Sequence, residues 1–104
     1  MSATSSLPPA LSPSPSVHFA AQADGAVLLD LAAGKFYGLN PTAAAIWKKI
    51  ADGVPLTEIP HELAPALSVD EARMRRDTHR LVHALHAVGL LIPLDRTANR
   101  GRRR

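Results

Sequence analysis

The chain contains no cysteine, and this excludes several chemistries at once. Disulfides, thiolate nucleophiles, iron–sulfur clusters and cysteine zinc sites all need the thiol that is missing. The sequence also lacks an apolar run near the roughly 20 residues of a membrane span. Its N-terminus has neither the charged nor the apolar region of a secretory signal. We therefore expect a cytoplasmic protein with no membrane partner.

The motifs of the common enzyme classes are missing too. GKFYG at 34–38 has neither the spacing nor the following Lys-Ser/Thr of a phosphate-binding loop. No G-x-S-x-G nucleophile elbow occurs. Glu71 and Asp77 fall on a predicted surface helix without a paired base, and Ser68 is better explained as a helix cap. We therefore expect no catalytic residue, no bound cofactor and no enzymatic activity.

The charge is concentrated at one end of the chain. The 104 residues hold 12 Lys and Arg against 9 Asp and Glu, but five of those bases lie in 96–104 with only Asp95 nearby. Residues 1–94 hold seven bases and eight acids, so that part is about neutral. We expect residues 95–104 to form a disordered basic tail, with a polyanion-binding arm as the alternative.

Composition divides the rest of the chain in two. Residues 1–16 hold six Ser, four Pro and no charge, so we expect a flexible, disordered segment. Residues 17–94 carry most of the apolar residues, which make up 46% of the chain, and form one small domain.

Three short apolar runs separated by turns predict an antiparallel meander. In the second run, Val27, Leu29 and Leu31 should share one face. The turns are expected at Asp24-Gly25 and at 32–34. The predicted strands are Val17–Ala21, Ala26–Leu31 and Lys35–Leu39.

The third predicted strand is an edge of the meander. An edge strand leaves N–H and C=O groups free to pair with another strand. Leu39 and Tyr37 should face the core and Phe36 should face solvent. Gly38 either lets a second backbone approach closely or marks a bulge.

Helical signals follow the strands. Asn40 is a good N-cap and Pro41 suits the first position of a helix that runs to Ala51. Thr57 is expected to cap a second, shorter helix, with Pro60 in its first turn.

The third helix is expected over about Val69–Val88. Ser68–Glu71 has the form of a capping box, and Gly89 has the form of a helix terminator. Leu90–Leu94 is a candidate for a final strand. The predicted fold is α+β: a three-stranded meander followed by three helices, the last two resembling a helix-turn-helix, as in a winged-helix domain.

Helical spacing divides the third helix into one buried stripe and two flanks. The buried stripe is predicted at Thr78, Leu81, Val82, Leu85 and Val88. The first flank is Arg73, Asp77, Arg80 and Ala84, and the second is Arg75, His79, His83 and His86.

Residues of this helix also suggest two other functions, metal binding and nucleic-acid binding. The histidine spacing is compatible with a zinc or nickel site, but no carboxylate shares the stripe and Arg75 and Arg76 disfavour a cation. Nucleic-acid binding would use the helix-turn-helix and the tail. The acidic start of the helix at Asp70-Glu71 and the neutral body argue against it.

The span from Val27 to Leu91 resembles the PqqD-like peptide chaperones, also called leader-peptide recognition elements. The shared pattern is a hydrophobic strand, Gly-Lys, an aromatic, Leu-Asn, a small-residue helix ending in Ile-Trp, and an Asp-led last helix ending in Gly-Leu-Leu. The matching residues are Gly34, Lys35, Tyr37, Leu39, Asn40, Ile46, Trp47, Asp77, Leu85, Gly89 and Leu90.

This resemblance implies a non-enzymatic adaptor that binds the leader of a ribosomally made precursor peptide. The leader would add an antiparallel strand to the third strand and lie beside the third helix. The "TAAAIW" helix looks most like the stand-alone protein of lasso-peptide biosynthesis, whose partners are a leader protease and a cyclase. A chaperone for a radical-SAM enzyme is the close alternative. Either a monomer or a weak edge-strand dimer is expected. The predicted peptide-binding residues are Lys35, Phe36, Tyr37, Gly38, Leu39, Arg73, Asp77, Arg80, Leu81 and Ala84.

Overall fold

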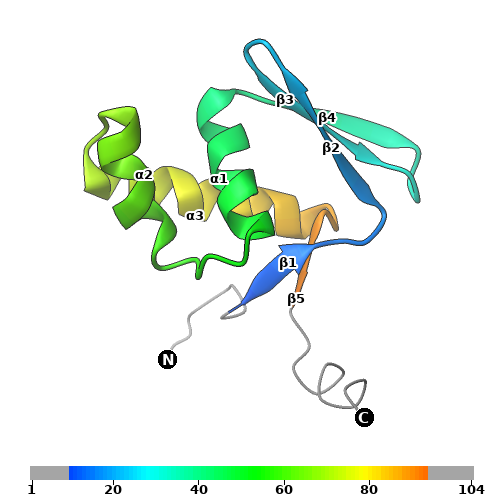
Figure 1. Ribbon diagram of the computed structural model, residues 1–104. Coiled ribbons are helices and arrows are strands. Elements are labelled where there is room, and N and C mark those ends of the chain that lie inside the picture. The colour runs from blue at the N-terminus through cyan, green and yellow to red at the C-terminus, as the bar shows by residue number, and fades with distance from the viewer. Residues whose placement is uncertain (1–9, 94–104) are drawn as a thin grey trace.

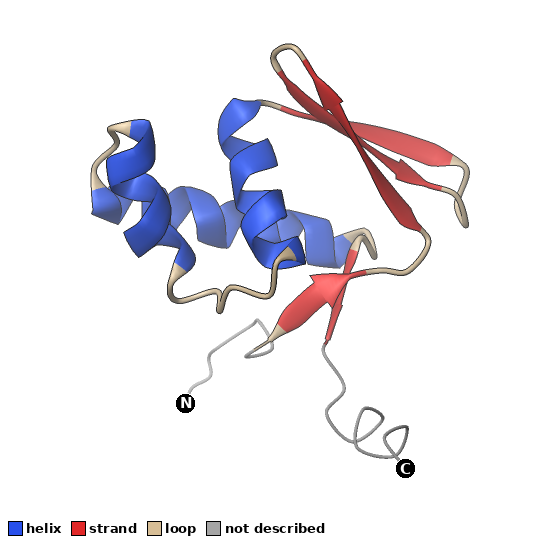
Figure 2. Ribbon diagram, viewed as in Figure 1, coloured by secondary structure: helices blue, strands red, loops and turns tan. Residues whose placement is uncertain are grey.

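A computed structural model describes residues 10–93 of the chain (Figure 1). The predicted tail at 95–104 lies outside the described residues. The three helices gather on one side and the longer strands on the other (Figure 2). No helix among residues 10–93 is both long and apolar enough to cross a membrane. The elements in chain order are β1 (Leu11–Pro13), β2 (Val17–Gln22), β3 (Gly25–Asp30), β4 (Lys35–Leu39), α1 (Pro41–Ala51), α2 (Ile59–Leu67), α3 (Glu71–Ala87) and β5 (Leu91–Pro93).

The predicted meander is confirmed as a three-stranded antiparallel sheet in the order β2-β3-β4. Strand β4 has the predicted bounds, β2 ends one residue later than predicted, and β3 begins and ends one residue earlier. Leu28 in the middle strand pairs with Phe19 on one side and Tyr37 on the other. Because directly paired residues point to the same face, this row faces the helices, and Leu28 is fully buried.

The face of β3 that enters the core differs from the expected apolar face. Ala26 and Leu28 are buried, whereas Val27 and Leu29 are half-buried on the opposite face. Leu31 lies beyond the strand, in the exposed turn. Consecutive apolar residues make alternation a poor guide to the buried face, and the contacts with α1 decide it.

Asp30 shares the buried face of β3 and caps the following turn. Its carboxylate accepts a hydrogen bond from the backbone N–H of Ala33 at 3.2 Å. The hydroxyl of Ser16 lies 3.5 Å from the same oxygen, Oδ1. A buried carboxylate needs such partners, and here they link the residue before β2, the end of β3 and the β3–β4 turn.

A second, two-stranded sheet joins the two ends of the described chain (Figure 1). Leu11 pairs with Pro93, and Pro13 pairs with Leu91. Leu11 is 7% exposed and belongs to the core. The expectation of a flexible segment over residues 1–16 is therefore wrong for residues 10–16, and residues 1–9 lie outside the described part. The final strand, expected at Leu90–Leu94, is observed at Leu91–Pro93.

Helix α1 begins as predicted. The side chain of Asn40 accepts a hydrogen bond from the N–H of Ala43 at 2.8 Å, and Pro41 occupies the first turn. The helix ends at Ala51, before Gly53 with its positive φ of 85°. Ile46, Trp47 and Ile50 are buried, which makes α1 the central helix of the core.

The cap predicted for α2 is wrong. Glu58, not Thr57, occupies the N-cap position, and its side chain makes no capping hydrogen bond. Pro60 lies in the first turn as expected, while Pro65 stands inside the helix. Residues 56–58 form a turn before the helix. Thr57 therefore lies one residue before the N-cap position.

The predicted capping box before α3 is also wrong. Ser68 is the C-cap of α2 and adopts a left-handed conformation with φ of 57°. Asp70 is the N-cap of α3 instead, and its carboxylate accepts from the N–H of Arg73 at 3.2 Å. Helix α3 therefore covers Glu71–Ala87, and Gly89 follows it with the expected positive φ.

The buried stripe of α3 is largely as predicted. Thr78, Val82 and Leu85 are buried, and Leu81 is half-buried against the core. Val88 is 48% exposed, because it lies beyond the helix at the C-cap. Met74 is fully buried and extends the stripe by one turn toward α2.

Candidate functional site

Strand β4 is an open edge of the three-stranded sheet. In the part of the chain that the structure describes, β4 pairs with β3 on one side and with no strand on the other. The pairing runs without interruption from Asp30–Lys35 to Ala26–Leu39. This register excludes the bulge at Gly38 that the sequence left open.

The side chains of β4 alternate as predicted. Leu39 is 8% exposed and Tyr37 is half-buried against the core, so both face inward. Phe36 is 74% exposed on the outer face. Among residues 10–93, no heavy atom lies within 4 Å of a Cβ built on Gly38, so the outer face of the described sheet is open there. The edge thus combines an unpaired backbone, one exposed aromatic and one open position.

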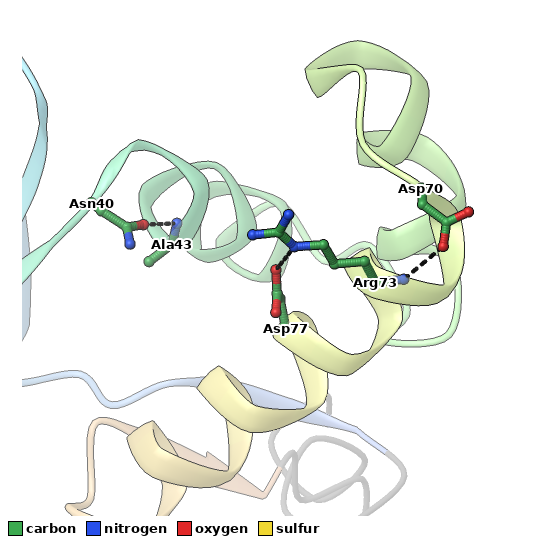
Figure 3. A network of polar contacts seen from close by, with 5 residues as sticks. All are labelled: Asn40, Ala43, Asp70, Arg73 and Asp77. Carbon is green, nitrogen blue, oxygen red and sulfur yellow. Dashed lines mark hydrogen bonds and ion pairs between the residues drawn. The ribbon is translucent and has the colours of Figure 1, made fainter.

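The first flank of α3 carries an ion pair near its N-terminal end. Arg73 and Asp77 form an ion pair, with Arg73 Nε 3.6 Å from Asp77 Oδ2. In Figure 3 the Arg73 side chain points from α3 toward Asn40 and Ala43, at the first turn of α1. Asn40 directly follows β4.

The remaining α3 positions of the predicted site differ in exposure. Arg80 and Ala84 are exposed, and Leu81 is half-buried. Arg80 has no carboxylate within ion-pair distance among residues 10–93, unlike Arg73. An exposed i,i+4 ion pair contributes about 0.3–0.5 kcal/mol, so Arg73 is held only weakly by Asp77.

Strand β4 and helix α3 share no extensive contact. The main contacts of β4 are with β3 and α1, whereas those of α3 are with α1, α2 and β5. The ten predicted site residues therefore fall on two surfaces, one on β4 and one on α3. A ligand that contacts both surfaces has to lie between them.

The second flank of α3 lines two hollows that the sequence did not predict. One, of about 720 Å³, is open and basic, and its second-flank residues Arg75, His79 and His83 are joined by Arg76 and by Arg80 of the first flank. The other, of about 300 Å³, lies between α2 and α3 over a largely apolar floor that includes Leu56, Pro60 and Val82. Thr78 also lines it, and its Oγ1 is buried without a hydrogen-bond partner among the described residues.

The histidines of this flank do not gather with other ligands. The rings of His79 and His83 stack with centroids 6.4 Å apart. Among residues 10–93, no three His, Asp or Glu side chains come close enough to hold a metal ion. Glu71, at the start of α3, contacts His61 at 3.6 Å and Arg75 at 3.7 Å.

Comparison with known proteins places the chain in a family. A family profile, "Coenzyme PQQ synthesis protein D (PqqD)", matches residues 25–91, which include β3, β4 and all three helices. The chain belongs to the PqqD family. Among curated proteins, none matches.

Two solved structures share both fold and sequence with the chain. TbiB1 in complex with the TbiA(beta) leader peptide is 30% identical, with a TM-score of 0.73 over 81% of this chain and 98% of that one. Lasso peptide synthetase B1 complexed with the leader peptide is also 30% identical, with a TM-score of 0.72 over 80% and 98%. The α+β fold and the resemblance to leader-peptide recognition proteins that the sequence predicted are thereby confirmed.

Proposed function

We propose that this chain is a non-enzymatic adaptor that binds the leader of a ribosomally made precursor peptide. The leader adds an antiparallel strand to β4 and also contacts the first flank of α3. The observation that carries this proposal is the open β4 edge, paired on one side only. Family membership and two similar proteins with bound leader peptides support it.

The chemistry of the edge suits a peptide backbone. Strand addition takes its affinity from main-chain hydrogen bonds and its specificity from alternating side chains. Lys35 is the single charge on β4, so the edge has little to repel an incoming strand. Phe36 and Gly38 give the outer face one aromatic contact and one position where a ligand side chain fits.

The α3 flank gives the leader a charged anchor. Arg80 has no carboxylate partner among the described residues, so an acidic leader residue would gain a pairing without breaking one. Arg73 would first have to leave Asp77 or share it. We therefore assign the stronger role in leader binding to Arg80, with Leu81 and Ala84 as apolar neighbours on the same surface.

The adaptor delivers the bound leader to maturation enzymes. We propose a leader protease and a cyclase of the lasso type, because both similar structures come from leader-binding proteins and one is a lasso peptide synthetase B1. A radical-SAM peptide-modifying enzyme is the alternative partner, supported by the PqqD profile.

Fluorescence polarisation of a labelled precursor leader tests the proposal. The leader should be encoded beside this gene, and a random DNA duplex at near-physiological salt is the comparator. We expect saturable peptide binding in the low-micromolar range or tighter, and no response to DNA. An inert leader together with DNA binding would overturn the adaptor and favour a role for the basic side chains of α3.

Proline substitutions separate strand addition from other binding modes. A variant with Phe36→Pro and Gly38→Pro loses backbone donors on β4, so we expect leader affinity to fall at least tenfold, as it would if about 1.4 kcal/mol of binding energy were lost. The matched control is His18→Pro with Ala20→Pro. These two residues of β2 pair with the same β3 residues as Phe36 and Gly38 do, but they lie on the opposite edge of the sheet. Circular dichroism checks that each variant is folded.

N-methylated leaders provide the same test without altering the protein. Methylation of alternate leader residues removes N–H donors from one edge of the added strand at a time. One of the two alternating sets should abolish binding and the other should leave it nearly intact. Equal affinity of both peptides would exclude strand addition even if the proline variants fail to fold.

A further inference from the structure

The β4 edge also matches a second copy of itself. We propose that β4 pairs antiparallel with β4 of another molecule about a two-fold axis at Tyr37, forming a dimer. The dimer buries the edge that the leader uses, so self-pairing and leader binding compete. The competition rests on the proposed function, whereas the dimer does not.

The two-fold register uses the whole strand. An antiparallel pair that is symmetric about Tyr37 sets Lys35 opposite Leu39 of the second copy, and all five residues of β4 find a partner. Tyr37 then lies opposite Tyr37 on the inner face. Aromatic cross-strand pairs of this kind stabilise an antiparallel strand pair.

The same register makes the outer face self-complementary. Phe36 lies opposite Gly38 of the second copy, twice in each dimer. Phe36 is 74% exposed, and nothing lies within 4 Å of a Cβ on Gly38, so the ring has a place to pack. An aromatic residue that covers a cross-strand glycine is a known way to stabilise an edge pair.

Neighbouring residues extend the apolar contact. Leu29 pairs with Phe36 within one molecule, and Val27 pairs with Gly38. Both are half-buried on the outer face. In the dimer, each Phe36 therefore reaches across the glycine toward Val27 of the other copy, and a continuous apolar band forms across the two sheets.

Charge does not oppose this pairing. Lys35 is the only charged residue on β4. The two Lys35 residues stand at opposite ends of the paired strands, four residues or about 13 Å apart along the strand. That separation exceeds the Debye length of about 8 Å at physiological salt, and each ammonium group faces a neutral Leu39.

Strand β2 is the other open edge of this sheet and the natural competitor. His18 pairs with Leu29 and Ala20 pairs with Val27, so they occupy the same two outer rows as Phe36 and Gly38. The β2 edge lacks the aromatic–glycine match, because His18 would face Ala20 of the second copy. The proposal therefore commits to β4, and β2 supplies a matched control.

Cysteine cross-linking tests the register directly, since the chain has no cysteine of its own. In an equimolar mixture of Phe36→Cys and Gly38→Cys molecules, the two thiols are directly opposite, with Cβ atoms about 4.5–5.5 Å apart. Each variant alone offers only a diagonal pair, whose Cα atoms, about 7–8 Å apart, are too distant for a disulfide. We expect the mixture to yield several-fold more cross-linked dimer than either variant alone.

The wild-type chain gives an independent readout. Sedimentation equilibrium should show a monomer–dimer equilibrium, and excess leader should shift it to leader-bound monomer and suppress the cross-link. A monomer at every soluble concentration, or preferential cross-linking of a His18→Cys and Ala20→Cys mixture, would overturn the β4 dimer. A dimer that persists with saturating leader bound would overturn the competition.

Failure of this inference can be told from failure of the proposed function. Leader binding by a protein that never dimerises removes the dimer and leaves the adaptor intact. A cross-linked β4 dimer in a protein that binds no leader removes the adaptor and the competition, and leaves self-pairing intact.

Discussion

Gly25 fixes the junction between β4 and α1. Its φ is +137°, and a Cβ added to it would overlap the carbonyl oxygen of Leu39. The first residue of β3 thus packs directly against the last residue of β4, just before the N-cap Asn40. The sequence marks Asp24-Gly25 as a turn, but it does not reveal this contact, because Leu39 is distant along the chain.

Gly25→Ala should therefore destabilise the fold. We expect the free energy of unfolding to fall by about 2–3 kcal/mol, from backbone strain together with displacement of Leu39. Urea denaturation measures the change. Gly38→Ala is the matched control in the same sheet, and it should leave stability unchanged or raise it by up to about 1 kcal/mol. Equal losses at both positions would contradict a specific role for Gly25.

The local sequence pattern predicts where each strand and helix lies more accurately than where it begins and ends. The bounds of β4 were predicted correctly, because alternation and flanking turns coincide at Lys35 and Leu39. The start of α3 was not, because Ser68 and Asp70 are both good caps by composition. The short connection from α2 decides between them: Val69 N–H bonds Ala64 O at 2.9 Å and leaves Ser68 in the preceding helix end.

Substitutions at Ser68 and Asp70 test which of the two residues caps α3. Asp70→Ala should lower the free energy of unfolding by about 1 kcal/mol, since it removes the N-cap of α3. Ser68→Gly should raise it by up to about 1 kcal/mol, because glycine adopts the positive φ without strain. Thermal or urea unfolding measures both. A larger loss at Ser68 than at Asp70 would restore the capping box.

Over the whole molecule, long-range pairing is what the sequence could not show. Ser and Pro in residues 1–16 indicate flexibility, yet Leu11–Pro13 pairs with β5, some 80 residues away. Only the burial of Leu11 in a core built from distant helices stabilises so short a strand. The candidate site was likewise predicted as residues, but its division into two surfaces beside α1 depends on packing.

Leu11→Ala tests whether the pairing of β1 with β5 stabilises the fold. A buried Leu-to-Ala change costs about 2–5 kcal/mol, so the free energy of unfolding should fall by an amount in that range. Ser12→Ala keeps the backbone pairing of β1 and should stay within about 0.5 kcal/mol of wild type. Both are measured by urea denaturation, and an unchanged Leu11→Ala protein would mean that β1 and β5 do not pair in solution.

The same variant tests whether the two-stranded sheet affects leader binding at β4. Strands β1 and β4 both pack against α1. Strands β1 and β5 form one sheet, and β4 is an edge strand of the other. Folded Leu11→Ala protein should therefore bind the leader with wild-type affinity in fluorescence polarisation, despite its lower stability. A loss of leader affinity would mean that the pairing of β1 with β5 also positions α1 and, through α1, the β4 edge.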